Sequence, residues 1–119
     1  MAVGGVSVPR AGERVCGDRW AMRRRPRGVV ILVADGLGHG PQAAEAADAV
    51  TRVFLEHADD GPAATLQLGH DALRSTRGAA AAIAAIDGER GIVTYGGVGN
   101  IAGSVLTGAS RRSMVSHNG

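Results

Sequence analysis

The segment from Val29 to Pro41 constrains the fold of this chain more than any other. Its first part, Val29–Ala34, is a continuous apolar run rich in β-branched residues and bounded by turn signals, which predicts a strand buried on both faces. Asp35–Gly40 is typical of a tight glycine-rich loop, and Pro41 suits the first position of a helix. We therefore expect a buried strand, a tight loop and a helix start to meet at one place in the fold.

Helical periodicity follows this loop. Apolar residues recur at spacings of three and four from Pro41 to about His57, which predicts an amphipathic helix. The stripe consists of Ala44, Ala47, Val50, Val53 and Phe54. Asp59–Pro62 breaks this helix, and a second helix is expected from about Pro62 to Ser75. Its residues that we expect to face the core are Leu66, Ala72 and Leu73.

Strand patterns occupy both ends of the chain. The segments that we expect to form further strands are Val3–Val8, Glu13–Met22, Ala79–Ile86, Ile92–Val98, Asn100–Leu106 and Ser113–His117. A turn at 23–28 and a hairpin connection at 87–91 separate neighbouring strands. Strands, then two helices, then strands again predict an α+β fold, in which a largely antiparallel sheet arrangement has helices packed outside it.

The bulk composition fits one small domain of 119 residues. The hydrophobic fraction is 45%, and because there is only one Trp, one Tyr and one Phe, the core must consist mainly of aliphatic residues and Ala. A lone cysteine, Cys16, excludes an internal disulfide and is expected to be a small buried residue. Because no apolar stretch is long enough for a transmembrane helix and the N-terminus lacks a signal-peptide pattern, we expect a cytoplasmic protein without a membrane partner.

The basic residues are unevenly placed along the chain. All 13 are Arg, the formal net charge is +2, and most of the excess precedes residue 28. This asymmetry could attract an anionic partner, or it could belong to a solvated turn. We do not expect nucleic-acid binding, because no aromatic residues interleave with the arginines.

Two aspartates are candidate metal ligands. Asp35 ends the buried strand, and the glycines after it allow a ligand and backbone carbonyls to come close. Hard divalent cations such as Mg²⁺ and Mn²⁺ prefer oxygen ligands, so the Asp35 carboxylate and the Gly36 carbonyl are suitable donors. Asp18 is the second candidate if it faces the same mouth from a neighbouring strand. The alternatives are an Asp that forms a turn at a strand end and an edge-strand Asp that faces water.

Other motifs do not meet the requirements of the sites they suggest. The histidines His39, His57, His70 and His117 match no zinc spacing, and for His39, which lies in the glycine loop, a structural role is preferred to a catalytic one. Gly97–Gly103 resembles a dinucleotide-binding loop, but its third glycine is displaced and a strand is expected after it. No Ser-His-Asp or Cys-His arrangement can be derived from spacing.

Four segments of the chain carry a resemblance to a known family. They are Gly12–Asp18, Val33–Gly40, Thr76–Ala80 and Tyr95–Ile101. In this order they resemble the metal-dependent protein serine/threonine phosphatases of the PPM type. The match is closest to the small bacterial branch similar to the stage II sporulation protein E and RsbX-like phosphatases. The resemblance covers nearly the whole chain, and the Asp-Gly-x-Gly-His-Gly motif at 35–40 is a fairly specific element of it.

The resemblance implies an αββα sandwich of antiparallel sheets flanked by helices, with two Mn²⁺ or Mg²⁺ ions at one end. It implies that Asp35 is the catalytic ligand that bridges both ions, and that Asp18 and the Gly36 carbonyl each bind one. The residues that would support the loop are Gly38, His39 and Gly40. The ions would activate a water that attacks the phosphorus of a phosphoserine or phosphothreonine. The implied partner is a phosphorylated regulatory protein in a bacterial sigma-factor or stress signalling cascade.

The family pattern also contains aspartates that have no counterpart here. They come from a Ser-Asp-Gly-like strand end and a late Asp-Asp or Gly-Asp motif, both of which would fall after residue 119. We therefore expect residues 1–119 to be the N-terminal part of a single PPM-type domain, without its C-terminal strands and remaining metal ligands. Asn118–Gly119 is expected to be a turn that leads onward.

Two functional hypotheses of different classes follow. The first is a phosphatase domain whose metal-dependent activity is lost when Asp35 is replaced. The second is a non-catalytic binding or regulatory module, or an inactive fragment of that fold, whose partner binding ignores both Mn²⁺ and Asp35. The choice between Mn²⁺ and Mg²⁺, the identity of the substrate and the oligomeric state stay open.

Overall fold

A computed structural model describes residues 1–117. The helices are α1 (Gly40–His57) and α2 (Pro62–Ala72), and a short 3-10 turn, η1 (Ala58–Asp60), lies between them. The strands are β1 (Asp18–Arg25), β2 (Gly28–Gly36), β3 (Ala79–Asp87), β4 (Ile92–Val98), β5 (Ser104–Thr107) and β6 (Ser110–Ser113). Strands flank a helical middle section, so the predicted α+β class is confirmed.

Four strands form one antiparallel sheet in the order β1-β2-β3-β4. The central strand β2 therefore pairs on both sides, which satisfies its backbone hydrogen-bonding groups within the sheet. The β1–β2 connection is tighter than the predicted turn at 23–28, because Arg25 already pairs with Gly28 and only Pro26 and Arg27 remain in the turn. β3 and β4 are confirmed close to their predicted bounds.

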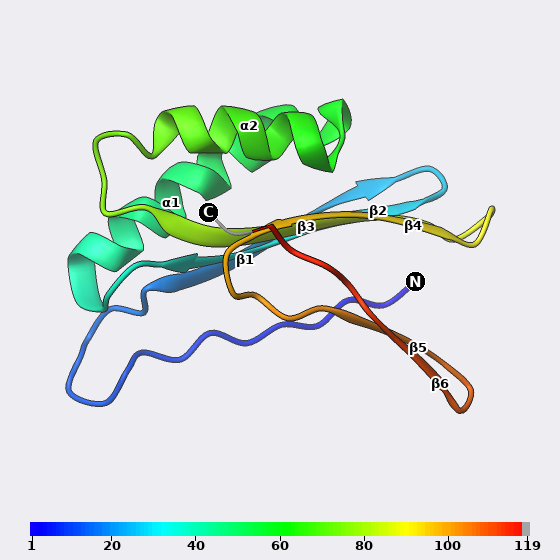
Figure 1. The fold of residues 1–119 in the computed structure, drawn as a ribbon, viewed down its shortest axis with the longest axis horizontal. Coiled ribbons are helices and arrows are strands. Elements are labelled where there is room, and N and C mark those ends of the chain that lie inside the picture. The colour runs from blue at the N-terminus through cyan, green and yellow to red at the C-terminus, as the bar shows by residue number, and fades with distance from the viewer. Residues whose placement is uncertain (118–119) are drawn as a thin grey trace.

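Both helices pack on the same face of this sheet (Figure 1). Side chains on alternate positions of β2 point toward the helices and meet the apolar stripe of α1. The core cluster comprises Val30, Leu32, Ala34, Ala47, Val50, Phe54, Ala58, Ala81 and Ile83. Leu66 and Leu73 pack against its edge as predicted, whereas Ala72 is exposed, because α2 ends at that residue rather than at Ser75.

The other face of the sheet is incompletely covered. Trp20 is 36% exposed, Val33 41% and Val93 37%, although all three are large apolar residues. The prediction that the β2 strand is buried on both faces is therefore wrong at Val33, although Val29, on the same face, is 0% exposed. In Figure 1 the N-terminal segment and the β5–β6 hairpin run below the sheet, on the side away from the helices.

The N-terminal segment does not form the strand predicted at Val3–Val8. Its contacts to the fold are made mainly by side chains: Arg24 Nη1 donates to the Met1 carbonyl at 3.1 Å, and Cys16 Sγ donates to the Val8 carbonyl at 3.3 Å. Within residues 1–117 no strand pairs with this segment, so its alternating valines have no ladder to join. Cys16 is half-buried rather than buried, and β1 begins at Asp18 instead of Glu13.

The C-terminal strands also differ from the prediction. Segment 100–106 is strand only from Ser104, and the last strand is Ser110–Ser113 rather than the predicted Ser113–His117; these two strands pair with each other. Gly108, with φ +56°, allows the tight turn that brings these short strands together. His117 instead makes a single bridge with Val98, and the turn expected at Asn118–Gly119 lies outside the described residues.

The layer arrangement is simpler than the expected αββα sandwich. Within residues 1–117 the second sheet consists of the two short strands β5 and β6, and helices cover one face of the main sheet. In the same part of the chain, no helix has the length and apolar character needed to cross a membrane.

Candidate functional site

The antiparallel register of β1 and β2 brings Asp18 directly opposite Asp35. Side chains at directly opposed positions point to the same face and have Cβ atoms about 4.5–5.5 Å apart. Since Val30, Leu32 and Ala34 point to the helices, the odd-numbered Asp35 points to the opposite face, and Asp18 points there with it. The two aspartates therefore form a carboxylate pair at one end of the sheet, on the face away from the helices.

The electrostatics of the carboxylate pair are unfavourable for two bare negative charges. Burial raises the pKa of Asp35 above its usual range, and the charge of Asp18 and a hydrogen bond with its side chain raise that pKa further. Both effects penalise the ionised form of Asp35. A cation placed between the carboxylates would reverse the penalty, because it interacts favourably with both.

Two glycines hold the carboxylate pair close to helix α1. A Cβ on Gly36 would lie 1.9 Å from the Ala43 carbonyl oxygen, and a Cβ on Gly17 would lie 2.8 Å from the Ala43 Cβ. The Gly36 N–H donates to the Gly17 carbonyl at 3.0 Å, which extends the β1–β2 contact beyond the pair. Glycine is therefore required at both positions for packing, whatever the Gly36 carbonyl binds.

The loop between β2 and α1 turns sharply at Gly38 (φ +87°) and Gly40 (φ +74°), a backbone conformation that glycine adopts without strain. His39 lies between them as the N-terminal cap residue of α1, and its Nδ1 is 2.5 Å from Glu13 Oε1. Glu13 is also the nearest neighbour of a Cβ built on Gly40, at 2.8 Å. The Glu13–His39 contact thus joins the N-terminal segment to the loop.

Glu13 is not among the site residues predicted from the sequence, although it lies within the Gly12–Asp18 segment. The signal was its position five residues before Asp18, in a segment where acidic residues are rare. Pairing with His39 could not be derived from the sequence, because it depends on how the N-terminal segment packs against a loop 26 residues further along the chain.

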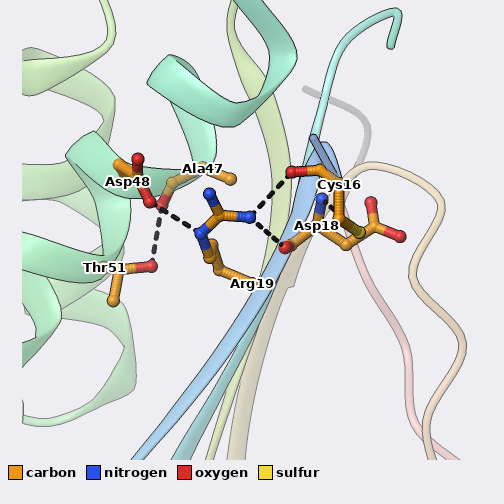
Figure 2. A network of polar contacts seen from close by, with 6 residues as sticks. All are labelled: Cys16, Asp18, Arg19, Ala47, Asp48 and Thr51. Atoms are coloured by element: carbon orange, nitrogen blue, oxygen red, sulfur yellow. Dashed lines mark hydrogen bonds and ion pairs between the residues drawn. The ribbon is translucent and has the colours of Figure 1, made fainter. Parts of the chain in front are cut away.

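Arg19 fixes the start of β1, where Asp18 is located (Figure 2). Its Nε donates to Asp48 Oδ1 of α1 at 2.7 Å, and its Nη1 donates to the carbonyls of Cys16 and Asp18 at 2.7 and 2.8 Å. Charge-assisted bonds of this kind are stronger than neutral ones. One guanidinium group therefore ties the backbone on both sides of Gly17 to the helix, and so positions Asp18.

Two hollows flank the carboxylate pair. The first, of about 310 Å³, lies toward the sheet and is bordered by Trp20 and by the N-terminal residues 3–7. The second, of about 320 Å³, lies toward the loop and is bordered by Arg10 and by Gly38, His39 and Gly40. Both include Asp18 and Asp35 in their walls, so a small ligand can reach the carboxylates from either side.

The donor set suits a hard divalent cation but is small. Two carboxylates and nearby backbone carbonyls are the ligands that Mg²⁺ and Mn²⁺ prefer. Within residues 1–117, however, no group of three or more His, Cys, Asp or Glu side chains is placed to hold one metal ion. His57, the last residue of α1, contacts Asp60 at 3.0 Å.

The chain is similar in sequence and in structure to known proteins. The chain is 32% identical over 90 residues to the phosphoserine phosphatase RsbX of Bacillus subtilis (strain 168), and these residues make up 76% of this chain. A solved protein of the bacterial stressosome, a modular system adapted to control secondary messenger signalling, matches 96% of the chain with a TM-score of 0.91 and 33% identity. RsbX in complex with magnesium matches 96% of the chain with a TM-score of 0.88 and 26% identity. No family model matches.

The chain is therefore homologous to RsbX, and its α+β arrangement of antiparallel strands and two helices is that of the RsbX structure. It spans 45% of the length of the curated RsbX, and 59% and 58% of the two solved chains. The matched region thus corresponds to about half of each relative.

Proposed function

We propose that this chain contributes to a metal-dependent phosphoserine or phosphothreonine phosphatase of the RsbX kind. The observation that carries the proposal is the register of β1 and β2, which pairs Asp18 with Asp35 on the face opposite the helices. Homology to a phosphoserine phosphatase, and the magnesium complex of that relative, support it. The substrate class is a phosphorylated regulatory protein of a bacterial stress or sigma-factor signalling cascade.

The residues that would hold Mg²⁺ or Mn²⁺ are the carboxylates of Asp18 and Asp35, together with the Gly36 carbonyl. When bound, two such ions supply an activated water and neutralise negative charge on a phosphoryl group. The chain itself holds the two carboxylates at a fixed separation through the β1–β2 ladder, and Arg19 anchors the strand that carries Asp18. Rigid placement of this kind is what catalysis by positioning requires.

We further propose that residues 1–119 are the N-terminal part of a single PPM-type domain. The support is that the chain matches only about half of each relative, and that its described residues provide two facing carboxylates rather than a full ligand set. In that arrangement a second sheet would cover the exposed side chains of Trp20, Val33 and Val93 and would supply the remaining metal ligands.

The small number of metal-ligating side chains also favours a second candidate function. In it, the chain is a non-catalytic regulatory module that binds a partner protein through the surface of this fold. In this case the carboxylate pair has no role in binding. Partner affinity would then be unchanged by Asp35→Asn and by removal of Mn²⁺, whereas the phosphatase needs both the metal and the aspartate.

The deciding experiment measures Mn²⁺-dependent hydrolysis of a phosphoserine peptide by the chain and by its Asp35→Asn variant. Asp71→Asn is the matched control, because Asp71 is an exposed acid on α2 that pairs with Arg74 at 3.4 Å. We expect hydrolysis that requires metal, disappears in Asp35→Asn and survives in Asp71→Asn, with circular dichroism showing all three proteins folded. A folded chain without any hydrolysis would rule out the phosphatase for these residues alone.

A further inference from the structure

Arg77 lies in the connection between α2 and β3, which is joined to the metal-site loop by a backbone hydrogen bond. The Leu37 N–H donates to the Gly78 carbonyl at 2.9 Å. Leu37 follows Asp35 by two residues, so the 76–78 connection is held directly beside the end of β2. Residues far apart in sequence are thereby brought together at one edge of the carboxylate pair.

The connection around Arg77 is itself well ordered by local bonds. Thr76 Oγ1 donates to the Leu73 carbonyl at 2.8 Å and accepts a hydrogen bond from the Gly78 N–H at 3.0 Å. Gly78 has φ +87°, which closes the turn into β3. Since both flanking residues are held, Arg77 projects from a defined point rather than from a mobile loop.

The guanidinium group of Arg77 lies against Gly38. A Cβ built on Gly38 would be 2.7 Å from Arg77 Nη1, and Gly38 lines the same hollow as Asp18 and Asp35. Glycine at position 38 thus serves the turn and also leaves room for this guanidinium. Arg77 therefore lies next to a residue that borders the hollow containing the carboxylate pair.

Arg77 differs from Arg19, Arg25 and Arg74 in that its side chain has no acidic partner in the described part of the chain. Arg19, Arg25 and Arg74 form ion pairs with Asp48, Asp59 and Asp71. Among residues 1–117, Arg77 has no acidic partner and donates no side-chain hydrogen bond, and it is exposed. Its planar fork of donors is therefore free for a ligand.

We propose that Arg77 binds the phosphoryl group of the substrate and so positions it beside the carboxylate pair; this inference rests on the proposed function. A phosphate monoester approaching Asp18 and Asp35 meets negative charge, and a fixed cation nearby offsets that repulsion. A guanidinium also binds two phosphoryl oxygens at once, which fixes orientation as well as position. Arg10, which borders the same hollow, suits this role less because it belongs to the irregular N-terminal segment.

The test measures binding of a fluorescein-labelled phosphoserine peptide by anisotropy, in parallel with steady-state hydrolysis. Arg77→Gln removes the charge and the donor fork. Arg77→Lys keeps the charge alone. Arg74→Gln is the matched control, because it removes an exposed Arg three residues away that pairs with Asp71. The unphosphorylated peptide provides the baseline, and thermal melts report whether each variant keeps its fold.

We expect Arg77→Gln to weaken phosphopeptide binding and raise KM by about tenfold or more. Arg77→Lys should recover part of the loss, and Arg74→Gln should behave like the parent chain. Mn²⁺ affinity, measured by calorimetry, should be unchanged in Arg77→Gln, because Arg77 does not hold the metal. A loss caused by altered folding would instead lower the melting temperature and metal affinity together, and would overturn the inference.

The inference and the proposed function can fail separately. Metal-dependent, Asp35-dependent hydrolysis with an unchanged KM in Arg77→Gln would overturn the role of Arg77 and leave the phosphatase standing. Phosphopeptide binding that depends on Arg77 in a chain that neither binds Mn²⁺ nor hydrolyses the peptide would keep the phosphoryl site and remove the enzyme.

Discussion

The two faces of the four-stranded sheet differ in how they are covered and in what they carry. The face toward the helices holds Leu32 and Ile83, which are 0% and 1% exposed, and it contains the whole core cluster. The opposite face has Val33 at 41% exposed and also carries the carboxylate pair. Leu32 and Val33 are neighbours on one strand, so the difference comes from side-chain direction and not from local sequence.

The side chains that stabilise the fold and the residues of the proposed site therefore lie on different faces of the sheet. The helix-covered face supplies most of the apolar burial that stabilises the fold. The carboxylate pair lies across the sheet from it, at the end of strands whose other side is firmly packed. Repulsion between the two carboxylates lowers the stability of the fold, and the apolar core on the other face offsets this loss.

The largest effect is expected from breaking the covered face. Leu32→Ala should lower the free energy of unfolding by about 2–5 kcal/mol, because it leaves a cavity in the core. Val33→Ala, one residue away, should lower it by less than about 1 kcal/mol, since that side chain already contacts water. Urea denaturation of both variants measures the contrast. Equal losses would mean that the opposite face is covered in solution.

A middle-sized effect is expected from Arg19, which ties the start of β1 to helix α1. Arg19→Ala removes the bonds to Asp48 and to the Cys16 and Asp18 carbonyls, and should cost about 1–2 kcal/mol of unfolding free energy. Because it positions Asp18, it should also weaken Mn²⁺ binding in calorimetry.

Arg23 is the matched control, since it too reaches from β1 to α1, where it donates to the Leu55 carbonyl at 2.7 Å. Arg23→Ala should leave Mn²⁺ affinity unchanged. If both variants weaken Mn²⁺ binding equally, the effect comes from general loosening of β1 and not from the carbonyls around Asp18.

The smallest effect concerns the carboxylate pair without metal. Asp35→Asn removes one of two like charges that face each other, and should raise the free energy of unfolding by roughly 0.2–1 kcal/mol in metal-free buffer. Added Mn²⁺ should stabilise the parent chain and not the variant. Thermal melts with and without Mn²⁺ measure both effects, and a variant less stable than the parent in metal-free buffer would contradict the repulsion between Asp18 and Asp35.

Much of the fold could be predicted because its signals are local. The apolar run at 29–34 and the period of α1 from Pro41 identified the central strand and the main helix. Glycine and proline identified the loop between them. The strand at 3–8 was wrong because alternation of valines predicts a strand only if a partner strand is available, and none pairs with it within residues 1–117.

The candidate site was predictable in part for the same reason. The sequence by itself determined that Asp35 ends a buried strand and precedes a glycine loop, since both features depend on neighbouring residues. Only the tertiary structure decided that Asp18 lies opposite Asp35, that Glu13 reaches His39 and that Arg77 lies against Gly38. These contacts depend on strand register and on the packing of segments distant in sequence, which local patterns do not encode.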